Sequence, residues 1–104
     1  MSINGYDLEK DDFISHTQIS SIETAVNIFW EYSEIGTKQI MELFNIKENA
    51  ANVYKRKIKT KMSQLEMNSH TYGGVNTKLA YAFWGLDIAD LEKRLKRLKS
   101  ATAI

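Results

Sequence analysis

The side chains best suited to specific chemistry lie between residues 47 and 61. An asparagine amide carries a donor and an acceptor that match the edge of adenine, and lysine or arginine can contact guanine or phosphate. Glu48 can accept a hydrogen bond from the amino group of cytosine. We therefore predict that this stretch reads base edges and neutralises phosphates of DNA, through seven residues: Lys47, Glu48, Asn49, Asn52, Lys55, Arg56 and Lys59.

Lysine and arginine residues are frequent in this stretch, and five of them fall within residues 55–61. At 100° per residue they spread around a helix, so not all of them can face one groove. Those near the exposed side would neutralise phosphates, and binding should then weaken as the salt concentration rises. We expect sequence recognition from the residues that precede them, at positions 47–52.

No comparable group of residues suggests catalysis or metal binding. The sequence has no cysteine, and His16 and His70 are far apart without other ligand residues nearby. It contains no glycine-rich phosphate loop, zinc-protease motif or serine elbow. We expect a binding protein rather than an enzyme, with no catalytic residue, metal or cofactor. Aromatic residues beside aliphatic ones are interpreted as core residues rather than as surfaces for base stacking: Phe29, Trp30, Phe44, Phe83 and Trp84.

Two helices joined by a tight turn would present the side chains at 47–52. Thr37 can cap the first helix, and Asn45 readily adopts the left-handed conformation that ends one. A longer helix is then predicted over residues 47–67. The apolar face of the first helix is formed by Ile40, Leu43 and Phe44.

Side-chain size predicts how these two helices pack. Ile46 can fill the corner between them, and Ala51 is small enough to let the second helix approach the first. Tyr54 would close the packed face. The alternative interpretation is a plain helical hairpin with a basic, solvated face.

Residues 20–61 resemble the small helix-turn-helix regulators carried by bacteriophages and mobile elements. In those proteins a Thr-x-x-Ile-x-x-Leu-Phe pattern precedes a basic helix. Two departures are Asn45, where many of them have glycine, and Ala50-Ala51, where a hydroxyl residue often precedes the small one. The resemblance implies binding of double-stranded DNA, with the start of the second helix in the major groove. The pattern is formed here by Thr37, Ile40, Leu43 and Phe44.

Charge is distributed unevenly along the chain, although the formal net charge is only +1. Residues 1–34 carry seven acids and one base, whereas residues 35–104 carry six acids and thirteen bases. Such an asymmetry favours an anionic partner for the basic part.

The N-terminal residues 1–19 show no clean periodicity, and we interpret them as a loosely ordered acidic arm. Ser20 and Glu23 stand at capping-box spacing and predict the start of a helix. That helix should continue to about Ser33, and Gly36 should end it.

A loop is predicted over residues 68–75, after the basic helix. Asn76 or Thr77 can then cap a helix that reaches about Trp84. Gly85 should interrupt it, because glycine disfavours a helix interior.

Asp87 can start a last helix to about Lys99, although one continuous helix over residues 77–99 is an alternative. A second, degenerate helix-turn-helix is a further alternative, although Ile88 and Leu91 would make the start of its second helix unusually apolar. This alternative rests on a similarity between two segments of the chain. It pairs Thr77-Lys78 with Thr37-Lys38, Ala80 with Ile40, Phe83-Trp84 with Leu43-Phe44, and Gly85-Leu86 with Asn45-Ile46.

Apolar residues in the C-terminal segment are spaced by four, three, four and three positions, which is the a/d pattern of a coiled coil. Such a helix can pack on the core of its own domain or on a second chain. We predict a homodimer, because a dimer would present two recognition helices to adjacent turns of the major groove. The predicted dimerisation residues are Trp84, Ile88, Leu91, Leu95 and Leu98.

Length and composition agree with one compact globular domain. The chain has 104 residues, of which 43% are hydrophobic and 26% charged. No apolar run is long enough to span a membrane, and the first ten residues lack the basic and apolar regions of a signal peptide. The absence of cysteine fits a reducing compartment, so we expect a cytoplasmic protein.

These patterns predict an all-α protein of four to five helices, with a helix-turn-helix domain at residues 20–67 and a C-terminal helical segment at 76–104. We expect it to bind double-stranded DNA as a transcriptional regulator or site-recognition protein of a phage or mobile element. The alternative is a helical interaction or assembly protein whose basic helices bind an acidic protein partner.

Overall fold

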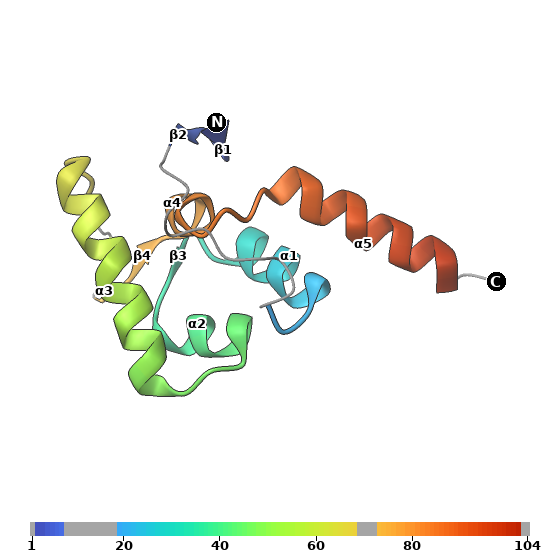
Figure 1. Ribbon diagram of the computed structural model, residues 1–104, viewed down its shortest axis with the longest axis horizontal. Coiled ribbons are helices and arrows are strands. Elements are labelled where there is room, and N and C mark those ends of the chain that lie inside the picture. Colours follow the sequence, from blue (N-terminus) through green and yellow to red (C-terminus); the bar gives the residue numbers. More distant parts are fainter. Residues whose placement is uncertain (1, 8–18, 69–72, 103–104) are drawn as a thin grey trace.

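The computed structural model describes residues 2–7, 19–68 and 73–102, which form five α-helices and four short strands (Figure 1). The prediction of a mostly helical protein is confirmed. A strictly all-α fold is wrong, because the strands pair into two small antiparallel sheets. The elements are β1 (Ser2–Ile3), β2 (Tyr6–Asp7), α1 (Ile22–Glu31), β3 (Glu34–Ile35), α2 (Thr37–Phe44), α3 (Glu48–Gln64), β4 (Val75–Asn76), α4 (Thr77–Phe83) and α5 (Ile88–Thr102).

Helix α1 is capped one residue later than the sequence predicts. The hydroxyl of Ser21 accepts a hydrogen bond from the backbone N–H of Thr24 at 2.9 Å, which satisfies a donor that the first turn leaves unpaired. The predicted cap, Ser20, instead donates its hydroxyl to the carbonyl of Glu42 at 2.8 Å. Its backbone N–H also donates to the carbonyl of Leu43 at 2.7 Å, so this residue fastens the start of α1 to α2.

Strands β3 and β4 join the two halves of the chain at the centre of the molecule. Ile35 pairs with Val75, and both side chains are fully buried. Val75 lies in the segment predicted as a loop, but its apolar side chain gains burial by pairing with β3. This pairing also explains why α1 ends at Glu31 and not near Ser33. Residues 69–72 of the predicted loop, with His70, lie outside the described residues, as does His16.

A cluster of aromatic rings forms the part of the core between the two halves. The rings of Phe44 and Trp84 meet edge to face with centroids 4.9 Å apart, and Phe44 meets Tyr54 at 5.3 Å in the same manner. The core assignment is confirmed for Phe29, Phe44 and Trp84, which are buried, and Phe83 is partly buried against the same core. It is wrong for Trp30, whose side chain is 63% exposed at the end of α1.

The first residues of the chain form a β-hairpin rather than a loosely ordered arm. Its turn places Asn4 and Gly5 at φ of 54° and 89°, backbone values that glycine adopts readily and asparagine more readily than most residues. The Asn4 amide donates to the carbonyl of Leu86 at 3.0 Å and accepts from the N–H of Ile88 at 3.1 Å. The hairpin thereby holds the connection between α4 and α5. Residues 8–18 of the predicted arm lie outside the described part of the chain.

Helices α4 and α5 are separate, so the alternative of one continuous helix is wrong. Gly85 interrupts them at a φ of 77°, as predicted, and the Asp87 carboxylate accepts from the N–H of Ala89 at 3.0 Å. After this turn α5 diverges from α4, packs along α1 and extends away from the rest of the molecule (Figure 1).

We expect ionisation of Tyr81 to limit stability at alkaline pH. Its hydroxyl donates to the carbonyl of Ala25 at 2.6 Å, and burial raises the pKa of the phenol above its ordinary value of about 10. Above that pH the unfolded chain releases the proton while the folded chain keeps it, so the free energy of unfolding falls as pH rises. Urea unfolding at pH values on either side of about 10 measures this decline.

The Tyr81→Phe variant provides the control, because it removes the ionisable group and keeps the ring. It should be less stable by about 0.5–1.5 kcal/mol near neutral pH, since it loses one hydrogen bond, and its stability should decline less above pH of about 10. If the free energy of unfolding declines equally in both proteins above a pH of about 10, Tyr81 does not cause the effect.

Candidate nucleic-acid interface

The turn between α2 and α3 has the geometry that the sequence predicts. Asn45 adopts the left-handed conformation, with φ 53° and ψ 52°. The N–H of Ile46 then donates to the carbonyl of Met41 at 3.1 Å, which satisfies one of the carbonyls that the end of a helix leaves unpaired. The prediction of a turn at Asn45 is therefore confirmed.

Close packing of α2 on α3 depends on a small residue. Ala51 is fully buried and lies with Ile40 and Leu43 in the core. Ile46 and Tyr54 are partly buried against the same core, as predicted. We refer to residues 37–64, which contain both helices and their turn, as the α2–α3 unit.

A hydrogen bond between Thr37 and Asn52 also fixes the α2–α3 unit. The Thr37 hydroxyl donates to the side-chain oxygen of Asn52 at 2.7 Å. Thr37 does not cap α2, so the prediction of Thr37 as its N-cap is wrong. That position is held by Gly36, whose N–H donates to the Gln39 side chain at 2.9 Å.

This bond bears on the role of Asn52, which is half-buried. Two-point recognition of adenine needs both the donor and the acceptor of the amide. Thr37 already donates to the side-chain oxygen of Asn52, so Asn52 helps to position α3 on α2, and its contact with a base stays a prediction.

The remaining predicted readers lie at the exposed start of α3. The helix begins at Glu48 with Lys47 as its N-cap, and Asn49 follows in the first turn. All three side chains are exposed. Arg56 is exposed about two turns further along and lies on the same flank as Asn49, opposite the buried Ala51.

The seven predicted DNA-binding residues do not include three members of this flank. Val53, which is 43% exposed, lies between Asn49 and Arg56, and Lys57 and Thr60 continue the same side of the helix. Projection at 100° per residue from Asn49 would have found them. We call Asn49, Val53, Arg56, Lys57 and Thr60 the outer flank of α3; it contains no acidic residue.

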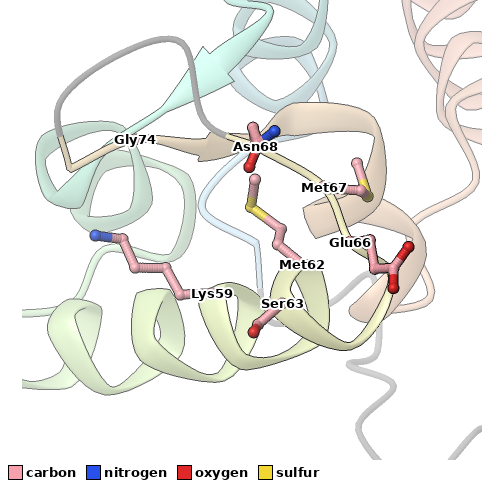
Figure 2. Close-up of a pocket in the computed structure, with 7 residues that line it drawn as sticks. All are labelled: Lys59, Met62, Ser63, Glu66, Met67, Asn68 and Gly74. Carbon is pink, nitrogen blue, oxygen red and sulfur yellow. The ribbon is translucent and has the colours of Figure 1, made fainter.

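Two predicted DNA-binding residues, Lys55 and Lys59, lie beside the outer flank, on the side of the helix away from Lys57. Lys55 is half-buried, and Lys59 borders a hollow at the C-terminal part of α3 (Figure 2). Figure 2 shows the Lys59 ammonium and the Glu66 carboxylate at opposite ends of this hollow. No acid and base converge among the residues drawn there, so the hollow does not form a candidate catalytic site.

Most of the residues predicted for dimerisation are buried or partly buried within one chain. Trp84 and Leu91 are fully buried, and Ile88 and Leu95 are partly buried against the same core. Leu98 is 53% exposed. Trp84 and Leu91 are therefore not available to a second chain in this fold. The homodimer stays a prediction, and Leu98 is the most exposed of the residues predicted for it.

The described ranges, 2–7, 19–68 and 73–102, contain neither a cluster of metal ligands nor a membrane-spanning helix. In these ranges no group of three or more histidine, cysteine, aspartate or glutamate side chains is placed to hold a metal ion. Among the same residues, no helix combines the length and the apolar character needed to cross a membrane.

Comparison with known proteins identifies no relative of this chain. No protein-family model, curated protein or solved structure matches the chain significantly. The fold itself defines the class: a small, mostly helical protein in which two packed helices joined by a left-handed turn present an exposed cationic flank.

Proposed function

We propose that this protein binds double-stranded DNA through the outer flank of α3. The supporting observation is that a closely packed α2–α3 unit exposes Asn49, Val53 and Arg56 together on a flank without acidic residues. In helix-turn-helix proteins the start of the second helix contacts base edges in the major groove, while the first helix crosses the backbone. The same docking would bring Asn49 to the bases.

Each exposed side chain has a matching partner on DNA. The Asn49 amide can bond to adenine at two points, and the methyl groups of Val53 can contact the methyl group of thymine. Arg56 can contact guanine or a phosphate, and Glu48 can accept from cytosine. Lys47, at the N-terminus of α3, would add a phosphate contact where the helix dipole already favours an anion.

The role that we propose is transcription regulation or site recognition. It is supported by the resemblance of residues 20–61 to regulators of phages and mobile elements, and by the chemical variety of the outer flank. An amide, an apolar side chain and an arginine can each contact the edges of bases, whereas contacts to phosphates carry no sequence information.

We expect Arg56→Gln to weaken DNA binding roughly tenfold and to reduce the slope of log K against log salt by about 1. The reason is the loss of one cation that neutralises phosphate or contacts guanine. Asn49→Ala should instead change the preferred base at one position, at a cost of about 1–3 kcal/mol for the original sequence. Fluorescence anisotropy with duplexes selected from a random library, at several salt concentrations, measures both effects.

Lys78→Gln is the matched control for the loss of charge. Lys78 is exposed on α4, outside both basic helices, so its substitution should leave affinity nearly unchanged. A wild-type protein that binds no duplex even at low salt would rule out the proposal. A stable complex with an acidic protein under those conditions would support the helical assembly protein instead.

A further inference from the structure

The chain contains the same structural turn twice, forty residues apart. Gly85 adopts the left-handed conformation that Asn45 adopts, and each follows a short helix that begins directly after a strand. In the second turn the N–H of Leu86 donates to the carbonyl of Tyr81 at 2.7 Å, as the N–H of Ile46 does to that of Met41 in the first. The helix–turn–helix connection that precedes α3 therefore recurs before α5.

We call residues 77–102, which contain α4, α5 and their turn, the second unit. Paired strands, β3 and β4, precede the first and the second unit. Ile35 and Val75 occupy equivalent positions, forty residues apart, and they are also direct partners in the β3–β4 pair. Antiparallel strands are locally related by a twofold rotation, so pairing of equivalent residues indicates two units arranged about this point.

The repeat extends into the basic segments. Two cations, one aliphatic residue, a lysine and a hydroxyl residue follow one another in both helices. The segment Arg56-Lys57-Ile58-Lys59-Thr60 of α3 corresponds to Lys96-Arg97-Leu98-Lys99-Ser100 of α5.

The second unit differs from the first in how its helices pack. Leu91 takes the place of Ala51, and its larger side chain prevents the close approach that Ala51 allows. Glu92 takes the place of Asn52, but its carboxylate accepts from the Trp30 indole N–H at 3.1 Å, on α1. The hydroxyl of Thr77, equivalent to Thr37, is buried without a hydrogen-bond partner among the described residues.

As a consequence α5 presents its basic face at the other end of the molecule. Lys93, Lys96 and Arg97 are exposed and lie on one side of α5, opposite the buried Leu91. The acid Asp90 borders this side, nearly in line with Arg97 along the helix, and its carboxylate forms an ion pair with Arg94 at 2.8 Å. We call Lys93, Lys96 and Arg97 the outer face of α5.

We propose that the outer face of α5 is a second DNA-binding surface, which contacts phosphates of the duplex that α3 recognises. This inference rests on the proposed function of α3. Three exposed cations complement the phosphate backbone, and phosphate contacts fix the position of a protein on DNA without reading the sequence. The face therefore contributes affinity rather than sequence preference.

The length of the molecule is compatible with this proposal. Helices α3 and α5 lie toward opposite ends of the longest axis, which measures 47 Å (Figure 1). Successive turns of the major groove are about 34 Å apart, so one chain is long enough to contact adjacent turns. A single chain would then supply the second basic helix for which the sequence predicted a homodimer.

The test is the triple variant Lys93→Gln, Lys96→Gln and Arg97→Gln, compared with wild type on a long and a short duplex. On about 30 base pairs the variant should bind at least roughly tenfold more weakly, with a salt slope smaller by about 2–3. On about 12 base pairs, which span little more than one turn, it should bind like wild type. Its base preference should not change.

The controls separate failure of this inference from failure of the proposed function. Circular dichroism and thermal unfolding should show that the variant is folded, because all three side chains are exposed. If the variant equals wild type on the long duplex while Arg56→Gln is weakened, the α5 surface is wrong and the α3 interface stands. If wild type binds neither duplex, both fail, and a changed base preference in the variant would overturn the assignment to phosphates.

Discussion

Replacing Ala51 with leucine is expected to lower the free energy of unfolding by about 1–3 kcal/mol, since a well-packed core accommodates added methylene groups poorly. Ala51 is fully buried where α3 approaches α2. The larger side chain should push the helices apart and break the bond between Thr37 and Asn52, which is 2.7 Å long. The same substitution should therefore weaken DNA binding, because the outer flank of α3 would no longer be held relative to α2.

Ala50→Leu is a matched control one residue away. Ala50 is exposed, so the same change in volume should alter the free energy of unfolding by no more than about 0.5 kcal/mol. Urea unfolding of the two variants gives the comparison. Equal stabilities would show that α2 and α3 do not pack closely at Ala51, and the hairpin with a basic, solvated face would then be the better description.

Replacing Leu91 with alanine should destabilise the protein by about 2–5 kcal/mol, which is the range for truncating a buried leucine. Leu91 is 1% exposed, and α5 packs against α1 along this part of the helix. The loss should appear as a lower urea midpoint at unchanged protein concentration, because the contacts are made within one chain.

Leu98→Ala on the same helix distinguishes the core from a dimer interface. Leu98 lies one heptad after Leu91 on nearly the same side of α5, but it is largely exposed. In a monomer its truncation should change stability by no more than about 0.5 kcal/mol. If the end of α5 holds a dimer, Leu98→Ala should instead lower the molar mass that light scattering measures, and the protein should become less stable on dilution.

Local chemistry explains which parts of the fold could be predicted. Asn45 and Gly85 end their helices because both residue types tolerate the left-handed conformation, a property that needs no tertiary contact. Asn76 caps α4 with its own side chain, which accepts from the N–H of Leu79 at 2.9 Å. Turns and caps of this kind depend on neighbours in sequence, so a single sequence predicts them.

Pairings between distant residues explain the errors. A two-residue strand such as Val75–Asn76 has too few residues to show an alternating pattern, and it exists because β3 lies beside it. The a/d spacing through Leu91 and Leu98 is identical for a helix on its own core and a helix on a second chain. Only the position of α1 decides that Leu91 is buried within one chain and that Leu98 is not.

The sequence by itself indicated a left-handed turn at Asn45, an interruption at Gly85 and basic residues after each of them, since these features depend on residue type and local spacing. Tertiary structure decided which side chains remain accessible. Asn52 and Asn49 are both asparagines near the start of α3, but in the folded protein Asn52 accepts a hydrogen bond from Thr37 whereas Asn49 is exposed. Tertiary structure also directed α5 onto α1, because Leu91 prevents the close approach that Ala51 permits in the first unit.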